Sequence, residues 1–495
     1  MNLSRRNFLD AAALLAVMSP LAVRAAIKSK ATDVPEDAVA MAQAVRDGKT
    51  TPKALVDRAI ARLEKANPQL NCVAFPNFSR ALEQAAGPVS GPLAGVPTLI
   101  KDNIDQKGLA NTNALKLFQG NIAAKNDPYV DAIERAGLIS IGRSTLPELA
   151  SNVTTESALT GITRNPWSLD HTSGGSSGGS SAAVASGVVP IAHGNDYAGS
   201  IRHAAAPTGL VGLKASRGRM TGDEKSRDAA QQLIQGALSR TVRDTAAWFA
   251  ATESTSPDAA FRPVGLIASR PAGKLRIGIR QELPRTGEKP SQAVQQIFTR
   301  SAALLERLGH QVHEAALCYD GPTVTSAYVE LWQAKLTRFF AGLERRVGRK
   351  ITPQDIEGRL LQMAAAGAAT SDSRMTECQR IVADGGARHA AQFDAFDVYM
   401  TPVFSTEPIR IGELGPGGAW SDQREHLMNY AGYCWIDNIA GTPAITLPMG
   451  MSRAGLPVGI QFAARPGAER TLIELAYSLE DHVRWWAKRP PIWVG

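Results

Sequence analysis

The sequence predicts an α/β protein, because helical segments and short apolar strands alternate along the chain. Asp127-Pro128 begins a predicted helix over residues 129–136, Gly137 ends it, and residues 138–141 form the next strand. Farther on, small residues favour a helix over 180–186, and the apolar run 188–192 favours a buried strand. With 495 residues, 44% of them hydrophobic, the chain can bury a large core around a sheet.

The remaining elements of the first half follow in chain order. Residues 36–47 predict a helix, and a second helix begins at Thr51-Pro52 and ends at Asn67-Pro68. The apolar residues 96–100 predict a buried strand, which places Lys101 at the end of that strand.

The second half begins with two predicted edge strands, 273–279 and 312–315, joined by a helix over 293–308. Residues from about 319 to 394 are rich in alanine and read as helices. Large side chains in this region either line a pocket or pack in the core, namely Trp332, Phe339, Phe340 and Met363.

Two loops rich in glycine and serine lie within residues 172–214. The first, Gly174 to Ser180, has few side chains to pack, so its backbone can approach another group closely. A flexible linker is disfavoured because apolar elements follow the loop, and a phosphate-binding loop is disfavoured because no Gly-Lys-Ser/Thr follows the glycines. A nucleophile elbow would need a hydrophobic strand before the loop, and residues 165–172 are not one.

These motifs resemble the amidase signature hydrolases. That family carries GGSSGGS, found here at residues 174–180, and a later loop that reads GNDYAGSIR at 194–202 in this chain. In the second loop, Asn195 replaces the usual threonine and Ala198 replaces the first glycine of the usual pair. The segment around Lys101 and the apolar stretches 441–448 and 455–461 are also similar to family segments, so that the resemblance runs from about residue 35 to the C-terminal region.

The resemblance implies a large mixed central sheet covered by helices on both faces. It also implies one amidase domain over residues 26–495, with a signature core at about 90–250. A variable region at about 319–440 would then surround the substrate entrance.

The resemblance further implies a Ser-cisSer-Lys site that needs no metal and no cofactor. Ser200 would be the nucleophile, Ser176 the bridging serine and Lys101 the base, and the backbone N–H groups of Tyr197, Ala198, Gly199 and Ser200 would form the oxyanion hole. Because a lysine acts as a base only when it is neutral, we expect burial to lower the pKa of Lys101 well below about 10.4.

The implied function is hydrolysis of a carboxylic amide C–N bond through an acyl-enzyme, with a small-molecule amide as the partner. The resemblance points to 6-aminohexanoate-type amides, aryl acylamides or peptide amides, and it leaves a homodimer open. Three other readings remain: a histidine-based triad that uses His171, His193 or His203, an amidotransferase subunit of a tRNA-dependent complex, and a non-catalytic amide-binding protein, to which Ala198 points.

Composition excludes several other classes. The formal charge of +8 is not gathered into a basic run with interleaved aromatics, so we expect no nucleic-acid partner. The cysteines form no C-x-x-C pair, which argues against a zinc site, and buried thiols are expected at Cys72, Cys318, Cys378 and Cys434.

Residues 1–25 resemble a twin-arginine export signal. Arg5-Arg6 precedes Phe8-Leu9 and an apolar run over 11–23, which is too short to be a permanent membrane span. Val23 and Ala25 supply small residues for cleavage. The mature protein is therefore expected to be periplasmic or secreted, a location that argues against the amidotransferase subunit.

Replacing Arg5 and Arg6 together by lysine tests this expectation. The precursor should stay in the cytoplasm, because the paired arginines are the targeting signal, while amidase activity in the lysate survives. Fractionation followed by immunoblotting measures the distribution, and normal periplasmic appearance of this variant would contradict the targeting prediction.

Overall fold

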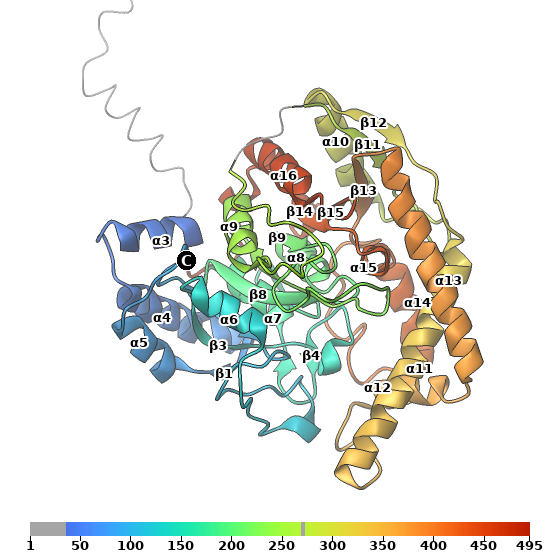
Figure 1. Ribbon diagram of the computed structural model, residues 1–495, viewed down its shortest axis with the longest axis horizontal. Coiled ribbons are helices and arrows are strands. Elements are labelled where there is room, and N and C mark those ends of the chain that lie inside the picture. Colours follow the sequence, from blue (N-terminus) through green and yellow to red (C-terminus); the bar gives the residue numbers. More distant parts are fainter. Residues whose placement is uncertain (1–35, 269–272) are drawn as a thin grey trace, which may run out of the picture. The chain divides into compact units, whose positions relative to one another are not determined.

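The centre of the described chain is a mixed sheet of eight strands in the order β12-β11-β13-β15-β14-β9-β10-β8 (Figure 1). β11 pairs in parallel with β12 and β13, and the other neighbours pair antiparallel. This sheet confirms the predicted α/β class. Its strands are β8 Ile191–Asp196, β9 Val211–Lys214, β10 Ile234–Ser239, β11 Arg276–Ile279, β12 Gln311–Glu314, β13 Val398–Pro402, β14 Ala444–Met451 and β15 Pro457–Ala464.

The computed structural model describes residues 36–268 and 273–495, and residues 37–495 form one compact unit. The export signal predicted for residues 1–25 lies outside the described residues. Its boundary, and the proposed division of the domain into a core and an entrance region, stay predictions.

A smaller sheet carries Lys101 to the edge of the large one. It is ordered β1-β3-β2, with β1 Val73–Pro76, β3 Ile139–Ser144 and β2 Pro97–Lys101. Every residue of β2 is buried. The Thr98 hydroxyl donates a hydrogen bond of 2.9 Å to the carbonyl oxygen of Ile191 in β8, so β2 is fixed against the last strand of the large sheet. Two short hairpins pair β4 Glu156–Ser157 with β5 Gly161–Ile162 and β6 Arg164–Asn165 with β7 Ser168–Thr172.

Helices cover both faces of the large sheet, as β9 illustrates. A Cβ atom at Gly212 would lie 2.8 Å from Cβ of Ala205 in α8, so this helix lies directly against the strand. The next residue, Leu213, points the other way into a hydrophobic cluster with Trp248 of α9. One face is covered by α7 Gly178–Ala185 and α8 Arg202–Thr208, and the other by α9 Val242–Thr252, α10 Gln292–Arg307 and α16 Glu469–Val483.

The other helices form two groups around this core (Figure 1). The N-terminal group is α3 Ala38–Arg46, α4 Pro52–Leu70, α5 Phe78–Ala86 and α6 Pro128–Arg135. In the second half, α11 packs on α12 and α13, and α13 packs on α15. These helices are α11 Gly321–Val347, α12 Gly358–Gly367, α13 Asp372–Ala391, α14 Trp420–Tyr430 and α15 Trp435–Ala440. Short 3-10 turns are η1 Lys116–Phe118, η2 Glu148–Ala150, η3 Gln392–Asp394 and η4 Trp485–Ala487.

One predicted helix end is wrong. α4 does not stop at Asn67-Pro68 but continues through Pro68 to Leu70. Because Pro68 lies in the last turn, it removes a single backbone hydrogen bond near the helix end. The side-chain oxygen of Asn67 accepts hydrogen bonds from the N–H groups of Cys72 and Val73, at 2.7 and 3.0 Å, and so organises the exit from the helix.

Two strand predictions also need correction. β8 begins at Ile191, not at residue 188, and continues to Asp196, because it pairs with β10 over that whole range. β11 is not an edge strand, since it lies between β12 and β13. Its burial depends on β13, which follows it by more than a hundred residues and which local patterning could not pair with it.

The expectation of buried thiols is confirmed for three cysteines and is wrong for Cys318. All four cysteines are free thiols, three of them buried and Cys318 partly exposed. Within residues 36–268 and 273–495, no helix has both the length and the apolar character that crossing a membrane requires.

Replacing Gly459 by alanine should destabilise the protein, because the added Cβ would lie 2.6 Å from Cβ of Ala206 in α8. Overpacking of this kind costs about 1–3 kcal/mol. The thermal midpoint at a fixed scan rate measures the loss. Gly358→Ala is the matched control, since no neighbouring atom lies within 4 Å of its added Cβ and it begins helix α12. Equal midpoints for the two variants would contradict the close packing of α8 on β15.

Candidate active site

Lys101 ends in a buried pocket that the two serine-rich loops form. Its Nζ lies 2.7 Å from Oγ of Ser176, 3.1 Å from Oγ of Ser177 and 2.9 Å from Oδ1 of Asn195. Lys101 and Ser176 have no exposed surface, and the Gly175–Ser176 peptide bond is cis. The fold therefore brings together two of the three predicted side chains, one from β2 and one from the loop before α7.

Burial lowers the pKa of Lys101 to about 7, and the carboxylate of Asp196 opposes part of this lowering. The difference from an ordinary lysine corresponds to about 5 kcal/mol against protonation. A large fraction of the molecules therefore holds a neutral amine at neutral pH, which is the state that a lysine base requires.

The contacts of Lys101 indicate which hydroxyl faces its lone pair. A neutral amine donates two hydrogen bonds and accepts one. Oδ1 of Asn195 can only accept, and Ser177 directs its own hydroxyl to the carbonyl oxygen of Asn195 at 3.3 Å, so its Oγ is left to accept from the amine. The hydroxyl of Ser176 is then the group that donates to Nζ.

Ser200 lies on the loop between β8 and α8 and lines a cavity. Its exposed fraction is 9%, whereas Lys101 and Ser176 are fully buried. The carbonyl oxygen of Ser200 accepts a hydrogen bond of 3.3 Å from the N–H of Ser177, which ties this loop to the one that holds Ser176. Of the three predicted side chains, Ser200 is the one that a molecule in the cavity can reach.

The predicted oxyanion donors are not equivalent. The N–H of Gly199 donates to Oδ1 of Asp196 at 2.7 Å and is therefore already engaged. The N–H groups of Tyr197, Ala198 and Ser200 have no acceptor within the part of the chain that the structure describes. Three of the four expected donors are thus left for a ligand.

Alanine at position 198 is compatible with this loop. The left-handed backbone conformation falls on Gly199, with φ of +125°, and Ala198 is not among the residues with positive φ. A Cβ at Gly199 would also lie 2.3 Å from Cε1 of His203. The position that requires glycine is therefore 199, and the argument from Ala198 for a non-catalytic protein loses its basis.

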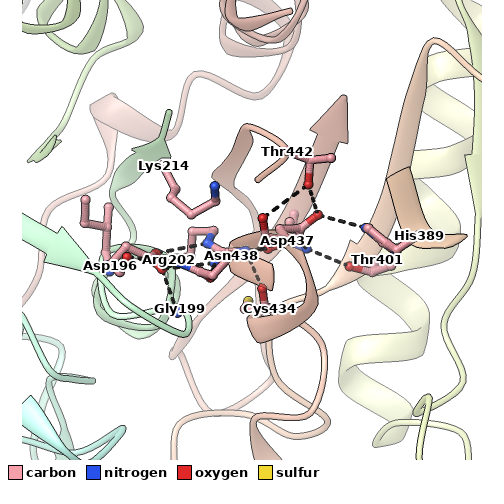
Figure 2. A network of polar contacts seen from close by, with 12 residues as sticks. Asp196, Gly199, Arg202, Lys214, His389, Thr401, Cys434, Asp437, Asn438 and Thr442 are labelled. Atoms are coloured by element: carbon pink, nitrogen blue, oxygen red, sulfur yellow. Dashed lines mark hydrogen bonds and ion pairs between the residues drawn. The ribbon is translucent and has the colours of Figure 1, made fainter. Parts of the chain in front are cut away.

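The carboxylate of Asp196 holds the backbone of the Ser200 loop in place (Figure 2). Its carboxylate accepts hydrogen bonds from the N–H groups of Gly199 and Ile201, from Nε of Arg202 at 3.0 Å and from Nδ2 of Asn438 at 2.9 Å. Burial alone would raise the pKa of Asp196, but the guanidinium of Arg202 and these hydrogen bonds hold it well below its ordinary value. Asp196 is therefore a fixed negative charge.

The network continues through Arg202 to α15 and α13 (Figure 2). Arg202 contacts Oδ2 of Asp437 at 3.1 Å, and Oδ1 of Asp437 lies 3.0 Å from Nε2 of His389. Burial favours a neutral His389, but the hydrogen bond to Asp437 outweighs it and raises the pKa to about 9. At neutral pH, positive and negative charges alternate from His389 to Asp196.

None of the three candidate histidines is placed as a triad histidine. Nδ1 of His193 accepts from the N–H of Lys101 at 3.2 Å, and its Nε2 lies 3.0 Å from Oε1 of Gln235. Burial lowers the pKa of His193 and of His203 to about 3. Among the described residues, no carboxylate is hydrogen-bonded to either ring or to His171.

A cavity of about 410 Å³ opens in front of Ser200. Its wall is mostly apolar and includes the aromatic rings of Tyr197, Tyr328 and Trp435. Trp332 and Phe339 also line it, whereas Phe340 and Met363 lie in the hydrophobic core. Of the four large side chains singled out in the sequence, two therefore line the pocket and two pack in the core.

Three buried polar atoms of residues on this wall have no hydrogen-bond partner among the described residues, namely Oδ1 of Asn113, Nε2 of His203 and Nε1 of Trp435. Leaving such atoms unpaired costs free energy, and water or a ligand usually pairs with them. They can hydrogen-bond a polar molecule held near Ser200.

Sequence reasoning missed most of the residues that support the site. Asp196 and Arg202 lie in the loop motif, and their opposite charges on either side of Ser200 are the sequence signal that could have identified them. Asp437, Asn438 and His389 lie more than 180 residues away, in segments without a recognisable motif, and only the packing of α13 and α15 brings them to the loop.

Known proteins share this architecture. The chain matches the Amidase family over residues 54–473. AmiC of Mycobacterium tuberculosis is 35% identical over 459 residues, which are 91% of this chain and 95% of AmiC.

Two solved structures are similar over nearly the whole fold. A 6-aminohexanoate cyclic dimer hydrolase, solved with its substrate, has a TM-score of 0.84 and 31% identity and covers 92% of this chain and 99% of its own. A bacterial aryl acylamidase of the amidase signature family has a TM-score of 0.80 and 26% identity, with the same coverage of 92% and 99%. The chain therefore belongs to the amidase signature family of amide C–N hydrolases.

Proposed function

We propose that this protein hydrolyses small carboxylic amides, with Ser200 as the nucleophile, Ser176 as the bridging serine and Lys101 as the base. The observation that carries the proposal is that Ser200 is exposed to the cavity and Lys101 is not. Ser200 faces the cavity, while the amine of Lys101 lies behind it, fully buried and 2.7 Å from Oγ of Ser176. Burial makes the amine a base, and exposure makes Ser200 the attacking group.

Proton transfer follows from the lone pair of Lys101. The neutral amine takes the hydroxyl proton of Ser176, which takes the proton of Ser200 as Ser200 attacks the amide carbonyl. The same path, run in reverse, returns a proton to the leaving nitrogen. Water then attacks the acyl-enzyme in the same way. The two N–H groups of the neutral amine donate to Oγ of Ser177 and Oδ1 of Asn195, so the lone pair stays directed at Ser176.

The N–H groups of Tyr197, Ala198 and Ser200 supply the oxyanion donors in this proposal. They need no reorganisation, because the hydrogen bonds of Asp196 to the N–H groups of Gly199 and Ile201 fix the loop on both sides of Ser200. We assign no oxyanion role to the N–H of Gly199.

The cavity favours substrates with an apolar or aryl body next to the scissile amide. Such substrates agree with those for which two similar proteins are named, a 6-aminohexanoate cyclic dimer hydrolase and an aryl acylamidase. Peptide amides remain within the proposal. Export to the periplasm or the medium, argued from Arg5-Arg6, is also part of it.

Separate alanine variants distinguish the two serines. Ser200→Ala should abolish labelling by a fluorophosphonate and lower kcat/KM on a neutral aryl anilide by about a thousandfold or more, because the nucleophile is gone. Ser176→Ala should lower kcat/KM by about a hundredfold yet keep slow labelling at Ser200.

The matched control for these variants is Ser181→Ala. Ser181 is also buried near the loop, but its hydroxyl only donates to the carbonyl oxygens of Ser173 and Gly178, so labelling and turnover should persist. Mass-spectrometric mapping of the adduct to any serine other than Ser200 would overturn the assignment.

The pH dependence of kcat/KM tests the base. Below pH 7, protonated Lys101 cannot accept the proton of Ser176, so kcat/KM should rise with pH through an apparent pKa of about 7 and then level off. Lys101→Ala removes the base, and Lys101→Arg replaces it with a guanidinium that stays protonated over this range. Both variants should therefore lose most activity.

A second buried lysine provides the control for this profile. Burial also lowers the pKa of Lys214 to about 7, but its Nζ donates to the carbonyl oxygen of Ala215, away from the serines. Lys214→Met should therefore keep the rise near pH 7. Retention of more than about a tenth of the activity in Lys101→Ala, a loss of less than about 1.4 kcal/mol, would exclude Lys101 as the base.

A further inference from the structure

Helix α11 presents one face to the cavity in front of Ser200. It contributes Tyr328, Trp332, Lys335, Leu336 and Phe339, each of which lies three or four residues from another member of the set, and all five line the cavity. Four of them are aromatic or aliphatic. The fifth, Lys335, introduces a charge into an otherwise apolar stripe.

No carboxylate of the described residues contacts Lys335. Its side chain is half-buried, and within the described residues its amine makes neither a hydrogen bond nor an ion pair. By comparison, Arg338 on the same helix contacts Asp372, and Lys350 just beyond the helix contacts Glu344. Burial lowers the pKa of Lys335, and the carboxylate of Asp228, which does not contact it, counteracts this effect.

The rest of the cavity wall does not balance this charge. Its described residues include no aspartate and no glutamate, and the polar ones are Asn103, Asn113, Ser151, Asn152, Ser200 and His203. These are neutral at neutral pH, because burial keeps His203 uncharged. A carboxylate that entered this cavity would meet one cation and no anion of the wall itself, with Asp228 acting on Lys335 from outside the wall. In these partly buried surroundings the attraction is stronger than in water.

We infer that Lys335 binds a carboxylate that the substrate carries at a distance from the scissile amide. The substrate class is an amide with an apolar chain or ring that ends in a carboxylate, such as a dicarboxylic acid monoamide or an N-acylated ω-amino acid. This inference rests on the proposed function of Ser200, because that function places the scissile amide in the same cavity. The same cation disfavours substrates that end in an ammonium group.

Equilibrium binding to the Ser200→Ala protein tests the inference without turnover. The ligands are para-nitroanilides of dicarboxylic acids from succinate to suberate, each compared with the alkanoyl anilide of equal chain length. At its best length, the carboxylate should bind about tenfold or more tightly than its neutral partner, as expected for a charge-assisted hydrogen bond. Fluorescence of Trp332 and Trp435, both in the cavity wall, reports binding.

Substitutions at position 335 assign this preference to the charge. Lys335→Met should reduce the carboxylate-to-neutral affinity ratio to about one, Lys335→Arg should keep it, and Lys335→Glu should favour ω-aminoacyl anilides. Arg338→Met is the matched control, because Arg338 lies on α11 but is paired with Asp372 and does not line the cavity. Its ratio should equal that of the parent protein.

A second ligand series separates the two ends of the amide. N-acylated ω-aminocarboxylates, compared with N-acylated alkylamines of equal length, place the carboxylate on the amine side. A preference that depends on Lys335 in either series supports the inference and identifies the side. Equal affinity for carboxylate and neutral ligands in both series, or a preference that survives in Lys335→Met, overturns it.

Turnover by the protein with Ser200 intact separates this inference from the proposed function. Failure to hydrolyse neutral anilides of every length would contradict the proposed function, whereas the affinity ratios would still report on Lys335. Hydrolysis of neutral anilides, with no carboxylate preference in binding, would leave the proposed function in place and reject the carboxylate site.

Discussion

The buried ion pair between Asp196 and Arg202 is the interaction on which the site depends. Asp196 fixes the backbone on both sides of Ser200, and Arg202 joins that backbone to α15. A buried carboxylate is costly unless it is paired and fully hydrogen-bonded, and here Arg202 and Asn438 meet that requirement. The loop therefore holds its shape before substrate arrives, which is what a set of preorganised N–H donors needs.

The same pairing allows the pKa of Lys101 to stay low beside an anion. An unpaired carboxylate near Lys101 would stabilise its protonated form and raise its pKa. Because the guanidinium of Arg202 lies directly on the carboxylate of Asp196, much of that field is cancelled. Burial then dominates, and the pKa of Lys101 falls to about 7. The pKa of Lys101 therefore depends on the ion pair between Asp196 and Arg202.

The helices that line the cavity are different segments from those that carry the proposed reacting groups. The proposed reacting groups come from β2 and the two loops within residues 174–202, whereas α11, α14 and α15 contribute part of the cavity wall. A change on α11 can therefore alter which amide binds while Lys101 and Ser176 keep their contacts. An unpaired lysine in such a wall acts on the substrate at a distance from the bond that breaks.

The sequence by itself determined the α/β class, the placement of Lys101 at the end of a buried strand, and the two serine loops. Those features are local: strand, cap and glycine signals lie within a few residues of one another, and the loop motifs are contiguous. The end of helix α4 could not be predicted correctly, because the side chain of Asn67 accepts hydrogen bonds from residues beyond the proline. Tertiary structure alone decided that β11 is internal, that Gly199 rather than Ala198 needs the left-handed backbone, and that His389, Asp437 and Asn438 support the Ser200 loop. The physical reason is that burial and charge pairing depend on partners distant in sequence, so no local pattern specifies them.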